Sequence, residues 1–294
     1  MTIRTNIRSW AKLLQSRSNF AALLLKYLYA CVALTEILRA HVYFGSARKR
    51  PQEYAPDFVC IGAQKTGTSW LDAVLRLHPQ IAMPRNRKEV HFYDTGFWKG
   101  KKWYAWNFRG GRHRIRGDIT PSYAILSPQA VQEMANFNPD TIVIFILRDP
   151  VERAWSMAYM DLIKTPKKRI EDVSDQIFLD HFKNSKSISR GRYSETIRLY
   201  LEAFGGDKLK ILLYDDICTD PRNFLRTMLE TVGVEISLMP DTKLLDGRVN
   251  VGGAAMPKRF KAELDEIYLD ELEYLRSHID RSKWPVWLEN KKSV

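Results

Sequence analysis

Cysteine is scarce in this chain of 294 residues, which contains three: Cys31, Cys60 and Cys218. An odd count is incompatible with a framework in which every cysteine is paired, and the spacing matches no metal-binding motif. Disulfides are typical of oxidising compartments, so the missing framework favours a cytoplasmic location. Cys60 lies in a short apolar run, where we expect a small core residue.

A long hydrophobic run is also missing. A bilayer-spanning helix needs about 20 apolar residues, whereas the apolar stretch at residues 20–35 is shorter and is interrupted by Lys26. Acids are rare in the same region, because residues 1–50 contain nine Lys or Arg and one acid, Glu36, and so carry +8 of the net charge of +12. We therefore expect a basic N-terminal arm with an apolar helix over residues 1–54, and a main domain over residues 55–294.

The arm allows three interpretations. Its helix could dock on the main domain, or it could lie in a membrane interface with its basic residues towards anionic lipid. It could also cross the membrane once, with a short basic cytoplasmic tail. We expect residues 1–50 to matter for location and not for chemistry, in a cytoplasmic protein that is membrane-associated through this arm or, as the alternative, a single-pass membrane protein.

A complete Walker A loop, Gly-x-x-x-x-Gly-Lys-Ser/Thr, is absent. Gly62 and Gly67 have the right spacing, but Lys65 precedes Gly67 and Thr68 stands in the place of the lysine. A turn with a solvated lysine is therefore one interpretation.

The order of elements around this loop favours an anion site. An apolar run at 58–61 predicts a buried strand, and apolar spacing at 70–77 predicts a helix. A strand, a loop of small residues and a helix start aim backbone N–H groups and the positive helix end at an anion, usually a phosphate. The residues placed to bind it are Lys65, Thr66, Gly67, Thr68 and Ser69.

Further apolar runs at 141–147 and 209–214 alternate with helical patterns. This alternation predicts an α/β fold, a P-loop-like three-layer domain whose central, mostly parallel sheet is flanked by helices. Ligands of such sheets lie off the carboxyl ends of the strands. Arg148 follows the run at 141–147 and is placed to reach an anion at the first loop, with an ion pair to Asp149 as the alternative. The polar segment 163–190 is expected to be a flexible lid or insertion.

A mixed polar and apolar segment at 88–94, Lys-Glu-Val-His-Phe-Tyr-Asp, is expected to be extended. Glu89 and His91 would then face the same side, and a carboxylate with an imidazole can serve proton transfer. A solvated pair on an edge is the alternative. The stretch 97–116 interleaves aromatic residues with cations, which suits either a sugar or nucleotide surface or a packed loop with solvated cations.

Several motifs in order resemble those of sulfotransferases that use 3′-phosphoadenosine 5′-phosphosulfate (PAPS), in particular the heparan-sulfate-type and bacterial carbohydrate branch. Residues 62–69 resemble the 5′-phosphosulfate loop of that family, and residues 88–94 resemble its catalytic segment. Residues 147–153 with Ser156 resemble its 3′-phosphate motif, and residues 191–193 a Gly-x-Tyr feature.

Two positions depart from the pattern of that family. Ile119 stands where glycosaminoglycan enzymes often have a lysine, and Asp246 stands in the lysine position of a Lys-Gly-Arg loop that covers the nucleotide.

The resemblance implies an enzyme that moves a sulfuryl group from PAPS to a hydroxyl or amine of a carbohydrate-type acceptor by in-line displacement, without a metal. It implies Glu89 as the base, His91 as its support or replacement, and Lys65 as the group that stabilises the leaving phosphate. The implied nucleotide-binding residues are Lys65, Thr66, Gly67, Thr68, Ser69, Arg148, Ser156 and Arg248. The implied acceptor-binding residues are Lys88, Tyr123 and Tyr193.

The expected partners are an anionic carbohydrate or glycolipid acceptor and a membrane surface, with no nucleic acid beyond the nucleotide. Two other functions stay open from the residues alone. One is a P-loop-type kinase that uses ATP and Mg²⁺, and the other is a non-catalytic protein that binds anionic polysaccharide.

Overall fold

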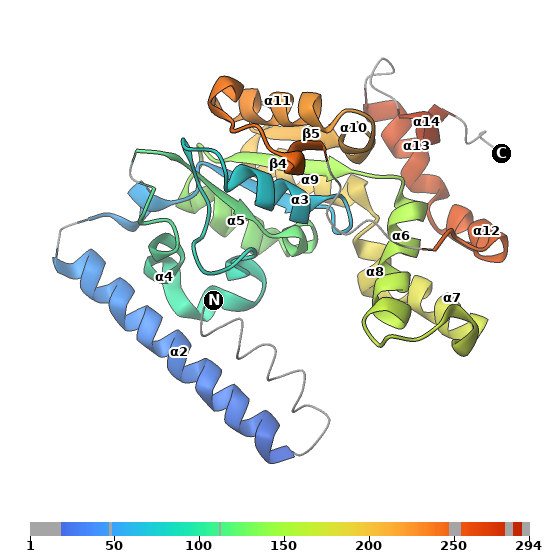
Figure 1. The fold of residues 1–294 in the computed structure, drawn as a ribbon, viewed down its shortest axis with the longest axis horizontal. Coiled ribbons are helices and arrows are strands. Elements are labelled where there is room, and N and C mark those ends of the chain that lie inside the picture. The colour runs from blue at the N-terminus through green and yellow to red at the C-terminus, as the bar shows by residue number, and fades with distance from the viewer. Residues whose placement is uncertain (1–18, 47–48, 112, 247–253, 280–284, 290–294) are drawn as a thin grey trace.

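One five-stranded parallel sheet forms the centre of the molecule, with the strand order β2-β3-β1-β4-β5 (Figure 1). The computed structural model describes residues 19–46, 49–111, 113–246, 254–279 and 285–289. The strands are β1 (Phe58–Gly62), β2 (Ile81–Ala82), β3 (Ile115–Ile119), β4 (Ile142–Leu147) and β5 (Leu209–Leu213). Three of the apolar runs thus form β1, β4 and β5, and the predicted α/β fold with a parallel central sheet is confirmed.

Helices cover both faces of the sheet and complete the three layers. Alternate residues of β1 point to opposite faces, as the pleat of a strand requires. Phe58 and Cys60 belong to one apolar core with α3, while Val59 and Ile61 belong to another with α4, α5 and α9. The helices concerned are α3 (Thr68–Leu75), α10 (Tyr214–Thr219) and α11 (Pro221–Thr231) on the first face, and α4 (Gly100–Trp106), α5 (Pro128–Phe137) and α9 (Tyr193–Phe204) on the second.

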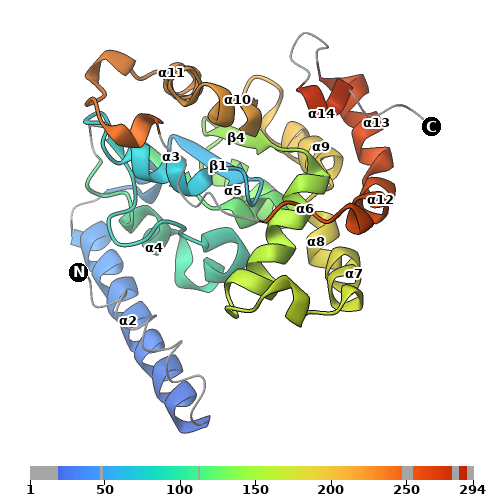
Figure 2. The ribbon, with the colours of Figure 1, turned by 45° about the vertical axis from the view of Figure 1, so that its right-hand side comes forward.

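A third cluster lies beside the sheet, around α6, α7 and α12 (Figure 2). Its rings stack, with Trp155 at 5.5 Å from Phe178 and 5.9 Å from Phe260. The segment 163–190 is therefore largely a helical part of this cluster, packed on α6 and α12, which favours the alternative of an insertion over a flexible lid. The elements are α6 (Pro150–Ala158), continued by a π-helix (Tyr159–Lys164), then α7 (Asp175–Lys183), α8 (Ser185–Ser189), α12 (Lys258–Ile267), α13 (Leu269–His278) and α14 (Val286–Glu289).

The aromatic and basic stretch 97–116 mostly packs against the domain. Trp103, Tyr104 and Phe108 are buried in the core. Cations cover the ring faces from within the protein, with Lys99 Nζ 4.3 Å from the Trp103 ring and the Arg109 guanidinium 3.6 Å from that of Trp106. The structure therefore favours the packed alternative over a sugar surface.

The long helix α2 (Asn19–Ser46) docks on α4, and its first turns project away from the body (Figures 1 and 2). Ala40 and Phe44 are buried in the core that α4 shares. Glu36, the one acid of residues 1–50, accepts hydrogen bonds from Arg87 Nη2 at 3.0 Å and Trp103 Nε1 at 3.1 Å. Since Arg87 lies two residues before Glu89, the helix of the arm is not independent of the site.

The side of α2 that faces away from α4 is apolar and exposed. Leu34, Leu38 and Val42, spaced four residues apart, are 54%, 66% and 69% exposed. As regards a membrane span, the part of the chain that the structure describes contains no helix with both the length and the apolar character needed to cross a bilayer.

The Glu36–Arg87 pair predicts that α2 supports the folded domain. Glu36→Ala should lower the free energy of unfolding by about 3 kcal/mol, because it removes the largely buried carboxylate that accepts from both Arg87 and Trp103. Urea unfolding of the full chain measures the change. Glu53→Ala is the control, since it removes an acid whose side chain is exposed. Equal changes in the two variants would show that the pair contributes nothing specific.

Candidate active site

The loop after β1 forms a cradle of backbone donors. Lys65 and Gly67 both adopt left-handed conformations, with φ of 73° and 78°; glycine adopts this region without strain, whereas a lysine there is uncommon. Thr66 Oγ1 donates to the carbonyl of Ala63 at 2.6 Å and holds the turn. Gly67 is the N-cap of α3, whose first N–H groups have no acceptor within the helix. The loop thus directs donors at the carboxyl edge of the sheet.

Arg148, at the end of β4, lies against this loop. Its Nη1 donates to the carbonyl of Lys65 at 3.0 Å, and its guanidinium lies 4.7 Å from the Tyr214 ring. Burial lowers the pKa of Lys65, and the charges of Arg148 and Lys164 lower it further. The loop and the end of β4 thus form one cationic region, in which a bound anion would relieve the repulsion.

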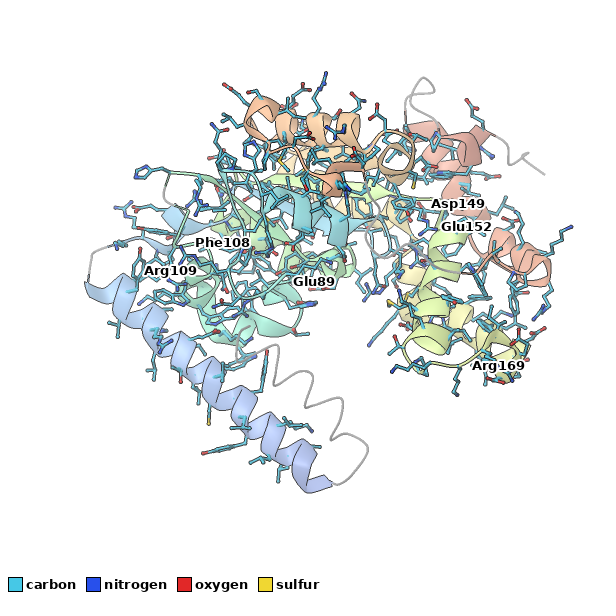
Figure 3. The ribbon with its side chains drawn as sticks, in the orientation of Figure 1. Glu89, Phe108, Arg109, Asp149, Glu152 and Arg169 are labelled. Atoms are coloured by element: carbon cyan, nitrogen blue, oxygen red, sulfur yellow. The ribbon has the colours of Figure 1, made fainter. Side chains whose placement is uncertain are left out.

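The start of α6 continues this region. Asp149 is the N-cap of α6 and accepts from the Val151 N–H at 2.9 Å, while Arg148 forms an ion pair with Glu152 at 4.0 Å. Figure 3 shows Asp149 and Glu152 together at the start of α6. Ser156 follows in the same helix and is partly exposed.

The segment 88–94 brings a chain of polar groups to the same edge. Lys88 Nζ donates to Ser69 Oγ at 2.9 Å and to Glu89 Oε1 at 3.0 Å. His91 Nε2 lies 3.0 Å from Glu89 Oε2, and His91 Nδ1 lies 2.7 Å from Asp94 Oδ2. Hydrogen bonds therefore connect the anion loop through Lys88 to the carboxylate and imidazole.

The predicted extended conformation of this segment is wrong, although Glu89 and His91 do meet. His91 is left-handed, with φ 54° and ψ 39°, and starts a short π-helix, η2 (Phe92–Gly96). This turn brings Asp94 back to His91, and Ser122 Oγ donates to Asp94 Oδ2 at 2.7 Å. Sequence reasoning missed Asp94 because a strand would place residues 91 and 94 on opposite faces. The available signal was the spacing His-x-x-Asp, which suits a helical turn.

The protonation states follow from these contacts. Hydrogen bonds to Asp94 and Glu89 raise the pKa of His91 to about 9. Burial acts to raise the pKa of Glu89, but hydrogen bonds with His91 and Lys88 and their charges lower it below its usual value. At neutral pH the pair is therefore a carboxylate beside an imidazolium, and only the carboxylate has lone pairs free to accept a proton.

A family model described as the sulfotransferase domain matches residues 55–250. The chain belongs to the sulfotransferase family. Membership is at odds with the alternative of a P-loop-type kinase.

Relatives support this membership. The chain is 27% identical over 272 residues to the bifunctional heparan sulfate N-deacetylase/N-sulfotransferase 1 of Caenorhabditis elegans, covering 81% of this chain and 32% of that protein. It is 33% identical over 111 residues to the membrane-associated sulfotransferase kil1 of Dictyostelium discoideum, covering 36% of this chain and 23% of that protein. The chain therefore spans about a third or less of the length of these curated relatives.

A solved sulfotransferase from Alicyclobacillus acidocaldarius has a similar structure. The TM-score is 0.61 with 26% sequence identity, and the match covers 78% of this chain and 98% of that chain. The fold of this sulfotransferase chain is thus P-loop-like, with a central parallel sheet flanked by helices.

Two residues expected to bind the acceptor are fully buried in the structure. Tyr123 accepts a hydrogen bond from the Phe92 N–H at 2.7 Å, and Tyr193 donates one to the carbonyl of Arg148 at 2.9 Å. Neither hydroxyl faces the open edge, so both support the backbone of the sulfotransferase site instead of touching an acceptor. The expectation for Arg248 falls on a residue outside the described part of the chain.

Proposed function

We propose that this sulfotransferase moves a sulfuryl group from PAPS to a hydroxyl or amine of a carbohydrate-type acceptor. The observation that carries the proposal is the position of Lys88, which hydrogen-bonds Ser69 of the anion loop and Glu89 together. A donor site and a base are thereby held next to each other. In-line transfer requires this arrangement, because the acceptor oxygen must approach sulfur opposite the bond that breaks.

The donor would bind at two points along the carboxyl edge of the sheet. The loop from Lys65 to Ser69 would hold the 5′-phosphosulfate with backbone N–H groups, hydroxyls and the lysine charge. Arg148 and Ser156 would hold the 3′-phosphate, with Arg148 as a bidentate hydrogen-bond donor. As the S–O bond to the phosphate breaks, the negative charge that grows on 3′-phosphoadenosine 5′-phosphate would be stabilised by Lys65 and Lys88.

Glu89 would act as the base. It would take the proton of the acceptor hydroxyl as the oxygen bonds to sulfur, and the imidazolium of His91, held by Asp94, would orient it. His91 is a weaker candidate because its two ring nitrogens both lie at hydrogen-bond distance from carboxylates. With its pKa raised to about 9, it is charged at neutral pH and has no free lone pair.

An anionic acceptor fits the charges around the base. Arg190, the C-cap of α8, has a buried Nε without a hydrogen-bond partner among the described residues. Burial and the charge of Arg153 lower its pKa, while Asp161, Glu89 and Asp94 act to raise it. With Lys88, it would offer cations to an acidic sugar, and heparan sulfate, named for the C. elegans relative, is a polymer of this kind.

A membrane surface is a second expected partner. The apolar side of α2 that includes Leu34, Leu38 and Val42 is exposed, and the exposed cations Lys26 and Arg39 lie on the same helix. An interfacial helix combines an apolar side with basic residues in this way. We propose that α2 rests on an anionic membrane while its other side stays docked on α4.

The first prediction concerns the 3′-phosphate. Arg148→Ala should weaken binding of 3′-phosphoadenosine 5′-phosphate by about 1.5–3 kcal/mol more than binding of adenosine 5′-phosphate, since a hydrogen bond to a charged group is worth that much. Isothermal titration calorimetry with both nucleotides measures the difference. Arg169→Ala is the control, because Arg169 lies at the far end of the α6–α8 region and is 78% exposed (Figure 3). Equal losses for both nucleotides would remove Arg148 from the 3′-phosphate site.

The second prediction concerns the base. Glu89→Gln should reduce turnover of labelled PAPS with desulfated glycosaminoglycans by about 10²–10⁴-fold and leave nucleotide affinity unchanged. Glu133→Gln, a partly exposed carboxylate on α5 paired with Lys101, should have little effect.

The pH dependence separates the two candidate bases. With Glu89 as base and His91 as a charged support, turnover should fall as the pH rises through about 9 and His91 loses its proton. A turnover that instead rises through that pH would assign the role of base to His91.

The third prediction concerns α2. Replacing Leu34, Leu38 and Val42 by serine should reduce co-sedimentation with phosphatidylserine-containing vesicles by about tenfold or more, because each apolar side chain contributes through its buried CH₂ groups. Leu201→Ser, an exposed leucine on α9, is the control. Failure of the full chain to bind these vesicles at low salt would contradict the proposed surface.

A further inference from the structure

The backbone at His91 is in a conformation that its own side chain does not favour. Its φ of 54° and ψ of 39° lie in the left-handed region, which an L-residue with a Cβ occupies only when its surroundings hold it there. The turn is also tight, since a Cβ on Gly96 would lie 2.6 Å from the carbonyl oxygen of His91. Something in the structure must stabilise this conformation.

Two buried hydroxyls hold the backbone N–H groups of the residues on either side of His91. The Val90 N–H donates to Thr120 Oγ1 at 3.1 Å, and the Phe92 N–H donates to the Tyr123 hydroxyl at 2.7 Å. Both acceptor side chains have no exposed surface. They lie within five residues of each other, directly after β3, so one rigid segment fixes both flanks of His91.

A buried carboxylate sets the direction of the Thr120 hydroxyl. Thr120 Oγ1 donates to Asp118 Oδ1 at 2.7 Å, and the Tyr104 hydroxyl donates to Asp118 Oδ2 at 2.9 Å. A hydroxyl has one proton and two lone pairs. Because the Thr120 hydroxyl donates its hydrogen bond to Asp118, its lone pairs remain to accept the Val90 N–H.

We propose that Asp118, Thr120 and Tyr123 form a positioning network that holds His91 in its left-handed conformation and thereby sets the distance between the imidazole and Glu89. None of the three side chains touches the acceptor or the nucleotide, so they act through the backbone of the catalytic segment. The inference deepens the proposed function and rests on the role proposed for Glu89.

The charges around His91 come from several elements. Lys88, Glu89 and Asp94 lie on its own segment, Asp118 lies on β3 within the core, and Arg190 of α8 acts on the same carboxylates. Burial raises the pKa of Asp118 to about 6, against the lowering effect of its hydrogen bonds. Asp118 is therefore ionised at neutral pH, the state in which it accepts from the hydroxyls.

The titration of the His91 ring tests the network without requiring turnover. NMR of the full chain can follow the ring signals of its six histidines, and His91→Gln identifies the signal of interest. The wild-type ring should titrate near pH 9, since it lies against Glu89 and Asp94. Tyr123→Phe and Thr120→Val each remove one backbone anchor, and each should lower this midpoint by about one pH unit or more as the contacts with the carboxylates lengthen.

Two matched variants separate positioning from general stability. Tyr268→Phe also removes a buried tyrosine hydroxyl, one that donates to the carbonyl of Ser187 at 3.2 Å in the third cluster and is bonded to none of the network residues. Thr120→Ser keeps the hydroxyl that Thr120→Val removes. Both variants should retain the wild-type midpoint of the His91 titration. If Tyr123→Phe fails to fold, the comparison of Thr120→Val with Thr120→Ser decides the test.

Turnover provides the second measurement. Tyr123→Phe and Thr120→Val should reduce kcat by about tenfold or more with unchanged affinity for 3′-phosphoadenosine 5′-phosphate, whereas Thr120→Ser should restore kcat. A His91 midpoint that is the same in Thr120→Val as in Thr120→Ser overturns the positioning network, whatever the turnover. Failure of the proposed function would give a different result. Wild-type protein would then show no sulfuryl transfer, while its His91 midpoint would still respond to Thr120→Val.

Discussion

Parallel pairing of β1 with β3 on one side and β4 on the other is the constraint on which the site depends. The register aligns Cys60 with Ile119 and with Ile144, so all three strands end at one edge of the sheet. The anion loop, the buried hydroxyls after β3 and Arg148 therefore emerge next to each other. The chain leaves the sheet at this edge after β1, after β3 and after β4. Each of the three segments therefore contributes its own kind of group.

Charge of opposite sign is divided along this edge. The loop and the end of β4 collect cations, whose mutual repulsion and burial lower the pKa of Lys65. The segment after β2 collects Glu89 and Asp94, held apart by the imidazolium of His91. Lys88 connects the two halves through its bonds to Ser69 and Glu89. The anionic sulfuryl donor and the proton of the acceptor hydroxyl would thus be bound by separate groups, and one chain of hydrogen bonds connects these groups.

The helix α2 has a different role on each side. Its inner side carries Glu36, which binds Arg87 beside the catalytic segment, whereas its outer side exposes Leu34 and Leu38. An exposed apolar side and a part of the domain core therefore belong to the same element. This explains why the composition of residues 1–50 indicated an arm, while the packing shows that its helix belongs to the domain.

The sequence by itself determined strands β1, β4 and β5 and the family, because strands buried on both faces must be continuous apolar runs and the glycine and lysine of the loop after β1 stand in a local pattern. Strand β3, Ile-Arg-Gly-Asp-Ile, is no such run, and its pairing with β1 is a feature of the tertiary structure. Only the tertiary structure decided the conformation of His91, since the bonds that hold it come from Thr120 and Tyr123, about thirty residues away in the chain. For the same reason Asp94 and the burial of Tyr193 escaped prediction. Side-chain roles depend on which distant groups accept or donate, and local spacing does not contain that information.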